Sequence, residues 1–152
     1  MKNVGCFVRS IGWICEQIAE KALKAKEIDY LWEESQRLGY INENDEVVNP
    51  HKIGEVALSI LGVGDQFSLY QVGLFENGQQ TFWGWVMNRP EFKKVHFLIQ
   101  KISVVDSPSG YHFRVVDHLG RVLFDPWKGG ITASEIIYST LYHVKRKKNG
   151  LV

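Results

Sequence analysis

Cysteine and histidine are the residues of this chain whose types and spacing could support nucleophilic chemistry. Both cysteines, Cys6 and Cys15, fall in a predicted amphipathic helix near the start of the sequence. Apolar positions recur at helical spacing from Phe7 to Ala22, and Cys15 belongs to this stripe, so we expect it to be a buried core residue with a raised thiol pKa. Cys6 lies off the stripe in the first turn, where the helix dipole favours a thiolate and lowers the thiol pKa. Two interpretations of Cys6 follow, a reactive nucleophile and a further buried residue.

A nucleophilic thiol needs a base, and the base needs an orienting partner. Of the five histidines, His112 lies inside the predicted strand Tyr111–Asp117, which turns back into a strand that ends at Asp125. If Val116 pairs with Arg121, the same register pairs His112 with Asp125 and places both side chains on one face, with β-carbons about 5 Å apart. A catalytic pair and a purely structural cross-strand pair both fit this pattern, and a one-residue bulge in the turn would separate the two side chains. The other histidines, which we expect to be exposed or structural, are His51, His96, His118 and His143.

Hydrophobic periodicity predicts the elements that position these residues. In the first sixty residues the apolar spacing is helical, with expected helices over Gly5–Lys24, Lys26–Leu38 and Pro50–Leu61. After Asp65 the pattern becomes that of strands separated by turns, with expected strands Phe67–Phe75, Gln80–Met87, Val95–Val105, Tyr111–Asp117, Arg121–Phe124 and Ile136–Val144. Helices followed by a run of strands predict an α+β domain in which an antiparallel sheet packs against the N-terminal helices.

Length and composition indicate one globular domain over residues 1–152. Hydrophobic residues make up 45% and charged residues 23% of the 152 positions, a balance that allows a full core. We expect a helical part over about 1–64, a β-rich part over about 65–145 and a solvated basic tail over 145–152. The formal net charge of +1 gives no reason to expect a nucleic-acid partner.

Arg9 and Glu16 interrupt the apolar N-terminal stretch, so the sequence predicts no membrane span and no secretory signal, and we expect a cytoplasmic protein. On one helix, Cys6 and Cys15 would lie roughly 13 Å apart, beyond the reach of a disulfide, so both are expected to be free thiols. No clustered cysteine and histidine spacing predicts a metal, and no cofactor is expected.

Two segments carry a resemblance to a known family: GCFVRSIGWICEQIA at the start, and GYHFRVVDHLGRVLFDPWKGG about one hundred residues later. Together they resemble the papain-like cysteine peptidases of the bacterial double-glycine leader type. In that family a cysteine begins the central helix, a histidine lies on a strand, and an Asp-Pro pair follows a turn. Cys6, His112 and Asp125-Pro126 match these positions in order. The resemblance implies a papain-like fold and a Cys-His-Asp triad.

The same resemblance implies a mechanism in which the Cys6 thiolate attacks a carbonyl, His112 transfers the proton and Asp125 orients the imidazole. These peptidases place an oxyanion-binding glutamine upstream of the cysteine. Here the only upstream amide is Asn3, at a different spacing.

Two functions therefore follow from the sequence. The first is a cysteine hydrolase that cleaves a peptide or isopeptide bond in a peptide or protein substrate. The second is a catalytically inactive papain-like binding module, with the aromatic run Phe82–Trp85 as its contact surface.

Overall fold

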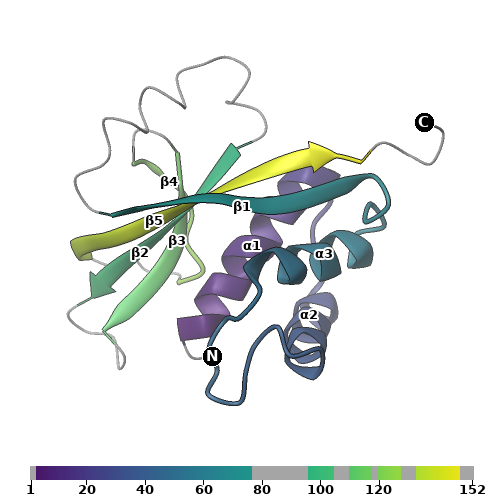
Figure 1. Ribbon diagram of the computed structural model, residues 1–152, viewed down its shortest axis with the longest axis horizontal. Helices are drawn as coiled ribbons and strands as arrows, with labels where there is room; N and C mark the ends of the chain where they lie inside the picture. The colour runs from purple at the N-terminus through teal and green to yellow at the C-terminus, as the bar shows by residue number, and fades with distance from the viewer. Residues whose placement is uncertain (1–2, 77–95, 105–109, 118–119, 128–132, 148–152) are drawn as a thin grey trace.

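A computed structural model describes residues 3–76, 96–104, 110–117, 120–127 and 133–147 of the chain. Three helices precede the strands in sequence (Figure 1): α1 (Asn3–Ala19), α2 (Ala25–Arg37), α3 (Pro50–Ile60), β1 (Phe67–Glu76), β2 (His96–Val104), β3 (Tyr111–Val116), β4 (Val122–Phe124) and β5 (Ala133–Arg146). This α+β arrangement is the predicted one. The expected strand Gln80–Met87 lies outside the described residues.

The five strands of the described residues form one sheet in the order β1-β5-β2-β3-β4, and every neighbouring pair is antiparallel. The helices gather on one side of this sheet, where α1 packs on β3 and α3 packs on β1 (Figure 1). The third helix, α2, packs on α3 and α1 instead of on the sheet. The predicted packing of N-terminal helices on an antiparallel sheet is therefore confirmed.

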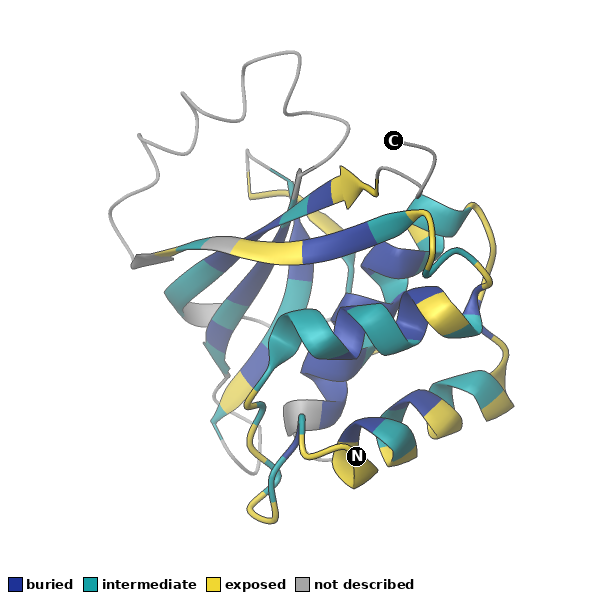
Figure 2. Cartoon of the chain, turned by 45° about the vertical axis from the view of Figure 1, so that its right-hand side comes forward, coloured by how far each residue is buried: buried dark blue, intermediate teal, exposed yellow. Residues whose placement is uncertain are grey.

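The main hydrophobic core fills the layer between the helices and the sheet, where the buried segments meet in Figure 2. Ile11 and Ile14 of α1 meet Val115 and Tyr142 of the sheet in this cluster. The approach of α3 to β1 is close, because a β-carbon at Gly54 would lie only 2.8 Å from Leu69 Cδ2. Glycine is the residue that allows this spacing.

The first helix ends five residues earlier than expected, at Ala19 rather than at Lys24. Glu20 takes a left-handed backbone conformation with φ 55°, and the backbone N–H of Leu23 donates to Glu16 Oε2 at 2.9 Å. The turn changes which residues face the core: Ala22, which the periodicity placed inward, is exposed, and Leu23 is buried. The other two helices end within a residue of the expected positions.

The predicted register of the β3–β4 hairpin is wrong. Val116 pairs with Val122 rather than with Arg121, and Val115 pairs with Phe124, so Leu123 is an extra residue in the second strand. Asp117 closes the turn by accepting the backbone N–H of Arg121 at 2.8 Å. The bulge therefore lies inside β4 and not in the turn, and Asp125 falls just beyond the end of β4.

The start of the expected basic tail is part of the sheet. β5 continues to Arg146, and the backbone N–H of Lys147 donates to the Gln66 carbonyl at 2.7 Å. Residues 145–147 are exposed to solvent, as expected, although 145 and 146 belong to β5; residues 148–152 lie outside the described residues. Among the helices of the described chain, none is long and apolar enough to cross a membrane.

Candidate active site

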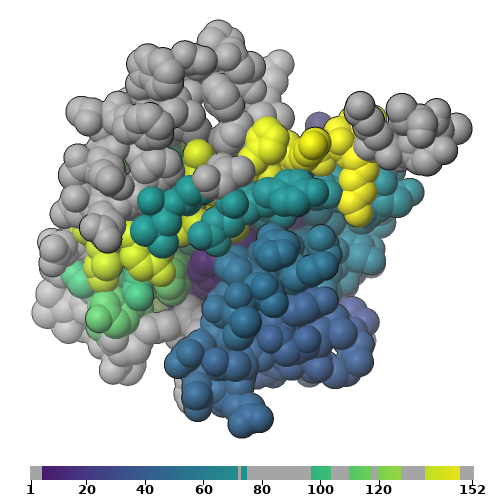
Figure 3. Space-filling model, in the orientation of Figure 1, coloured from purple at the N-terminus to yellow at the C-terminus, as the bar shows by residue number. Residues whose placement is uncertain are grey.

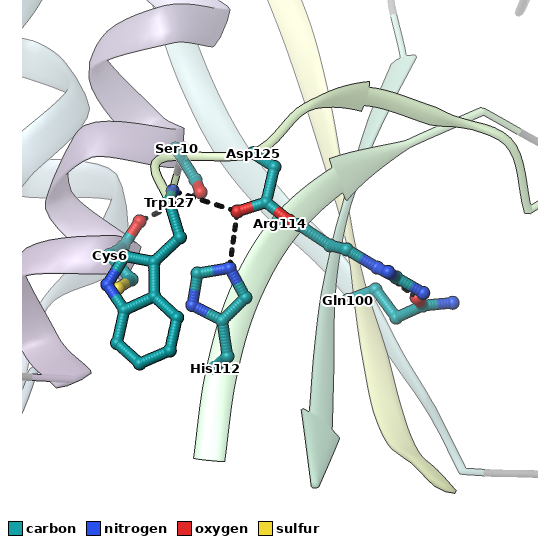
Figure 4. A network of polar contacts seen from close by, with 7 residues as sticks. All are labelled: Cys6, Ser10, Gln100, His112, Arg114, Asp125 and Trp127. Carbon is teal, nitrogen blue, oxygen red and sulfur yellow. Dashed lines mark hydrogen bonds and ion pairs between the residues drawn. The ribbon is translucent and has the colours of Figure 1, made fainter. Parts of the chain in front are cut away.

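His112 and Asp125 meet at the end of the β3–β4 hairpin (Figure 4). His112 Nε2 lies 2.6 Å from Asp125 Oδ1, and the imidazole is 0% exposed. An ionised carboxylate can only accept, so Nε2 carries the proton in this contact. The predicted pair therefore forms, but through a different register from the one expected: Asp125 follows the bulged strand and reaches back to the ring.

A tight turn after β4 holds the Asp125 carboxylate in place. Its Oδ1 also accepts the backbone N–H of Trp127, two residues further along, at 2.9 Å. This contact is a local side-chain turn of the kind that aspartate favours. It brings the Trp127 ring over the imidazole of His112, with centroids 5.0 Å apart and planes inclined by 28°. The indole covers one face of the histidine and keeps 36% of its own surface exposed.

The second ring nitrogen of His112, Nδ1, is buried and lacks a hydrogen-bond partner among the described residues. With the proton on Nε2, Nδ1 carries a lone pair and can accept a proton. Figure 4 shows the imidazole next to the Asp125 carboxylate, with the indole of Trp127 drawn between the ring and Cys6 of α1.

Two aromatic contacts fix α1 against the hairpin that carries His112 and Asp125. The rings of Phe7 and Phe113 meet edge to face with centroids 5.2 Å apart. The ring of Trp13 stacks on Phe124 of β4, with centroids 5.6 Å apart and planes inclined by 15°. Because Phe7 follows Cys6 and Phe124 precedes Asp125, these contacts position two of the predicted site residues.

Cys6 lies in the first turn of α1 and is buried, with 4% of its surface exposed. It is buried outside the main hydrophobic cluster, which takes Phe7, Val8 and Cys15 from the same helix. The backbone N–H of Phe113, the residue after His112, forms a hydrogen bond to the Cys6 sulfur. The structure therefore places the thiol against the strand segment that carries the histidine.

The pKa of the Cys6 thiol is raised, which contradicts the expectation of a lowered value. Burial is the largest cause, and the negative charge of Asp125 adds to it. The hydrogen bond from Phe113 favours the thiolate and lowers the pKa, but it does not offset the burial. Cys6 is thus a protonated thiol in this structure and not a preformed thiolate, and it forms no hydrogen bond with His112 Nδ1 among the described residues.

Cys15 is the core residue that the periodicity predicts. It is fully buried, and its thiol donates to the Gly54 carbonyl at 3.6 Å. Burial and the nearby Glu16 raise its pKa. Neither cysteine forms a disulfide.

Sequence reasoning missed three residues around the pair: Trp127, Arg114 and Gln100. Burial of the guanidinium lowers the pKa of Arg114. The nearby Asp125 carboxylate favours the charged form and opposes this shift. Arg114 Nε also donates to Gln100 Oε1 at 2.9 Å. Because Arg114 lies two residues after His112 on one strand, the alternation of strand faces could have predicted this neighbour.

The predicted oxyanion residue, Asn3, is the first residue of α1, and its side chain lies outside the described part of the structure. The aromatic run Phe82–Trp85 also lies outside it. No three histidine, cysteine, aspartate or glutamate side chains of the described residues are grouped to hold a metal ion.

Comparisons with known proteins add no family to this site. The chain has no significant match to a protein-family model, to a curated protein or to a solved structure. The chemistry of the site is therefore argued from its geometry.

Proposed function

We propose that this protein is a papain-like cysteine hydrolase that cleaves a peptide or isopeptide bond, with Cys6 as nucleophile, His112 as base and Asp125 as the group that orients the base. One observation carries the proposal: the buried His112 Nδ1 has no hydrogen-bond partner in the described chain, while Nε2 is held by Asp125 at 2.6 Å. A buried polar atom without a partner is unfavourable, and a catalytic role is one explanation for keeping such an atom.

Because the pKa of the Cys6 thiol is raised, the first step has to remove the thiol proton. His112 Nδ1 takes the thiol proton as the sulfur attacks the carbonyl carbon, and the carbonyl electrons move to oxygen. The protonated imidazole then donates to the leaving amine, and the C–N bond breaks to leave a thioester. Water attacks the thioester, His112 accepts the water proton, and the thiolate that leaves is protonated again.

The order and placement of the elements also support the proposal. The thiol comes from the N-terminal turn of a helix, while the histidine and the aspartate come from the end of a hairpin in an antiparallel sheet. Two aromatic contacts, Phe7 with Phe113 and Trp13 with Phe124, hold the helix against the hairpin.

The alternative, an inactive binding module of the same fold, is favoured by the burial of Cys6.

The test is cleavage of a library of internally quenched fluorescent peptides. We expect turnover by the wild-type chain and by the matched control Cys15→Ala, and none by Cys6→Ala. His112→Ala should lower kcat/KM by about 10²- to 10⁴-fold. Circular dichroism checks that each variant is folded. Turnover that persists in Cys6→Ala, or its absence for every peptide in the wild type, would contradict the hydrolase.

Alkylation by iodoacetamide gives a readout that needs no substrate. Cys6 should be labelled before the fully buried Cys15, but more slowly than an unfolded thiol at neutral pH, because its pKa is raised. Faster labelling of Cys15 would contradict the assignment of Cys6.

A further inference from the structure

Lys101 places a charge on the core-facing side of the middle strand of the sheet. β2 is the third of five strands, and Ile99, two residues earlier and therefore on the same face, belongs to the buried cluster. Burial lowers the pKa of the Lys101 ammonium. A lysine at such a position is unfavourable for the fold alone, so its surroundings indicate a role.

Three aromatic rings surround the ammonium. Lys101 Nζ lies 4.3 Å from the ring centroid of Tyr111, 5.2 Å from that of Tyr138 and 5.8 Å from that of Phe113. The register explains this cage, because Lys101 lies directly opposite Phe113 on one neighbouring strand and Tyr138 on the other. Within the described residues, Lys101 forms no ion pair with a carboxylate.

The caged ammonium lines a cavity of about 380 Å³. Figure 3 shows the hollow between the strands and the loop that joins α2 to α3, with α1 visible at its base. Tyr142 also lines it, and its buried hydroxyl has no hydrogen-bond partner in the described chain. The carboxylates of Asp45 and Glu46 lie on the loop side, so the cavity has a cationic wall and an anionic rim.

The cavity adjoins the candidate active site. Phe7 and Phe113 both line it, and they directly follow Cys6 and His112 in sequence. The backbone N–H of Phe113 contacts the Cys6 sulfur, while its ring faces Phe7. We therefore expect a peptide whose carbonyl reaches the thiol to place its neighbouring residues near this wall.

We infer that the Lys101 cavity is a specificity site for a carboxylate of the peptide substrate, which pairs with the ammonium inside the aromatic cage. This inference rests on the proposed hydrolase function. The carboxylate comes either from an acidic side chain or from a free C-terminus. The acidic rim of Asp45 and Glu46 opposes an anionic ligand, so the preference for a carboxylate comes from the Lys101 ammonium. A charge-assisted hydrogen bond in a partly buried cavity gives a strong preference for the acid over its amide.

The experiment measures binding of fluorescent acetylated hexapeptides to the Cys6→Ala chain by anisotropy. One arm compares glutamate with glutamine at each position, and a second compares a free C-terminal acid with its amide. We expect one acid to bind about tenfold more tightly than its amide, which corresponds to one net interaction of about 1.4 kcal/mol. Lys101→Met should abolish this ratio and Lys101→Arg should retain part of it. The exposed control Lys26→Met should leave it unchanged.

The two proposals fail separately. If Cys6-dependent cleavage occurs but Lys101→Met leaves the acid-to-amide ratio of kcat/KM unchanged, the specificity site is wrong and the hydrolase stands. If no peptide is cleaved but acids bind through Lys101, the hydrolase is wrong and the carboxylate site stands. Equal binding of acids and amides by the Cys6→Ala chain, both with Lys101 and with Lys101→Met, overturns the specificity site. A thermal melt of each Lys101 variant checks that a lost preference is not lost folding.

Discussion

The Asp125 carboxylate influences both of the other groups in the candidate site. It accepts a hydrogen bond from the Nε2–H of His112, which fixes the tautomer and leaves Nδ1 as the basic nitrogen. Its charge also raises the pKa of the Cys6 thiol and thereby disfavours the thiolate. One side chain therefore supports the base and opposes ionisation of the nucleophile.

Asp125→Asn separates these two effects. We expect the pKa of Cys6 to fall, because the nearby negative charge is removed. We expect kcat/KM to fall by about 10²- to 10⁴-fold, because an amide can donate to Nε2 and so favours the wrong tautomer of His112. The ultraviolet absorbance of the thiolate against pH measures the first change, and peptide cleavage measures the second.

Asp117→Asn is the matched control, since Asp117 lies in the same hairpin and accepts a hydrogen bond from the side chain of Arg121. It should leave the Cys6 pKa unchanged. An unchanged or higher Cys6 pKa in Asp125→Asn would refute the electrostatic role of that carboxylate.

The His112–Asp125 contact could be predicted because both residues belong to one short hairpin, where local spacing limits the possible partners. The sequence left the burial of Cys6 open as one of two interpretations, because helical periodicity describes only the face toward the main core. Cys6 is buried instead by the β3 edge, where Phe113 meets it. The stacking of Trp127 also depends on a turn whose direction the sequence pattern does not specify.

At the scale of the elements, the end of α1 stores backbone strain. Glu20 has φ 55°, a conformation that glycine adopts without penalty and that other L-residues adopt at a cost. This turn allows Leu23 to be buried in the core two residues before α2 begins at Ala25.

Glu20→Gly should therefore stabilise the protein. We expect the free energy of unfolding to rise by about 0.5–1 kcal/mol, since the left-handed conformation is retained without steric strain. The measurement is equilibrium denaturation by urea.

The control is Gln17→Gly, at an exposed position inside α1, which should lower the free energy of unfolding by about 1 kcal/mol. If both glycine substitutions destabilise the chain equally, the strain at Glu20 makes no net contribution.

Most element boundaries could be read from the sequence, because hydrophobic spacing reports directly on which side of a helix or strand is buried. Register could not, because one extra residue, Leu123, changes every later pairing without changing the apolar pattern of the neighbouring strand. The order of the strands in the sheet also depends on contacts between distant segments, which no local pattern encodes.

At the scale of the whole molecule, both buried thiols couple stability to alkaline pH. The pKa values of Cys6 and Cys15 are raised in the folded chain, so above the unfolded value of about 8.5 the folded chain holds more protons than the unfolded chain. The free energy of unfolding therefore falls as pH rises through this region.

Each thiol contributes a slope of up to about 1.4 kcal/mol per pH unit, present only above the unfolded pKa. We expect Cys15→Ala to reduce the loss of stability above about pH 8.5, as measured by urea denaturation across a pH series. Cys6→Ala is the comparison variant and should reduce it less, because Cys15 is the more deeply buried thiol. Parallel curves for the wild type and Cys15→Ala would show that the thiol pKa does not differ between the two states.

The position of β5 affects the order of events during synthesis on the ribosome. β5 comes after the other four strands in the chain, yet it lies between β1 and β2 and pairs with both. A nascent chain that ends before residue 133 can form the three helices and the β2–β3–β4 ribbon, but among the described strands β1 pairs only with β5. We therefore expect β1 to remain open to other chains until β5 emerges, so that slow translation before residue 133 lengthens the period of exposure to chaperones and to aggregation.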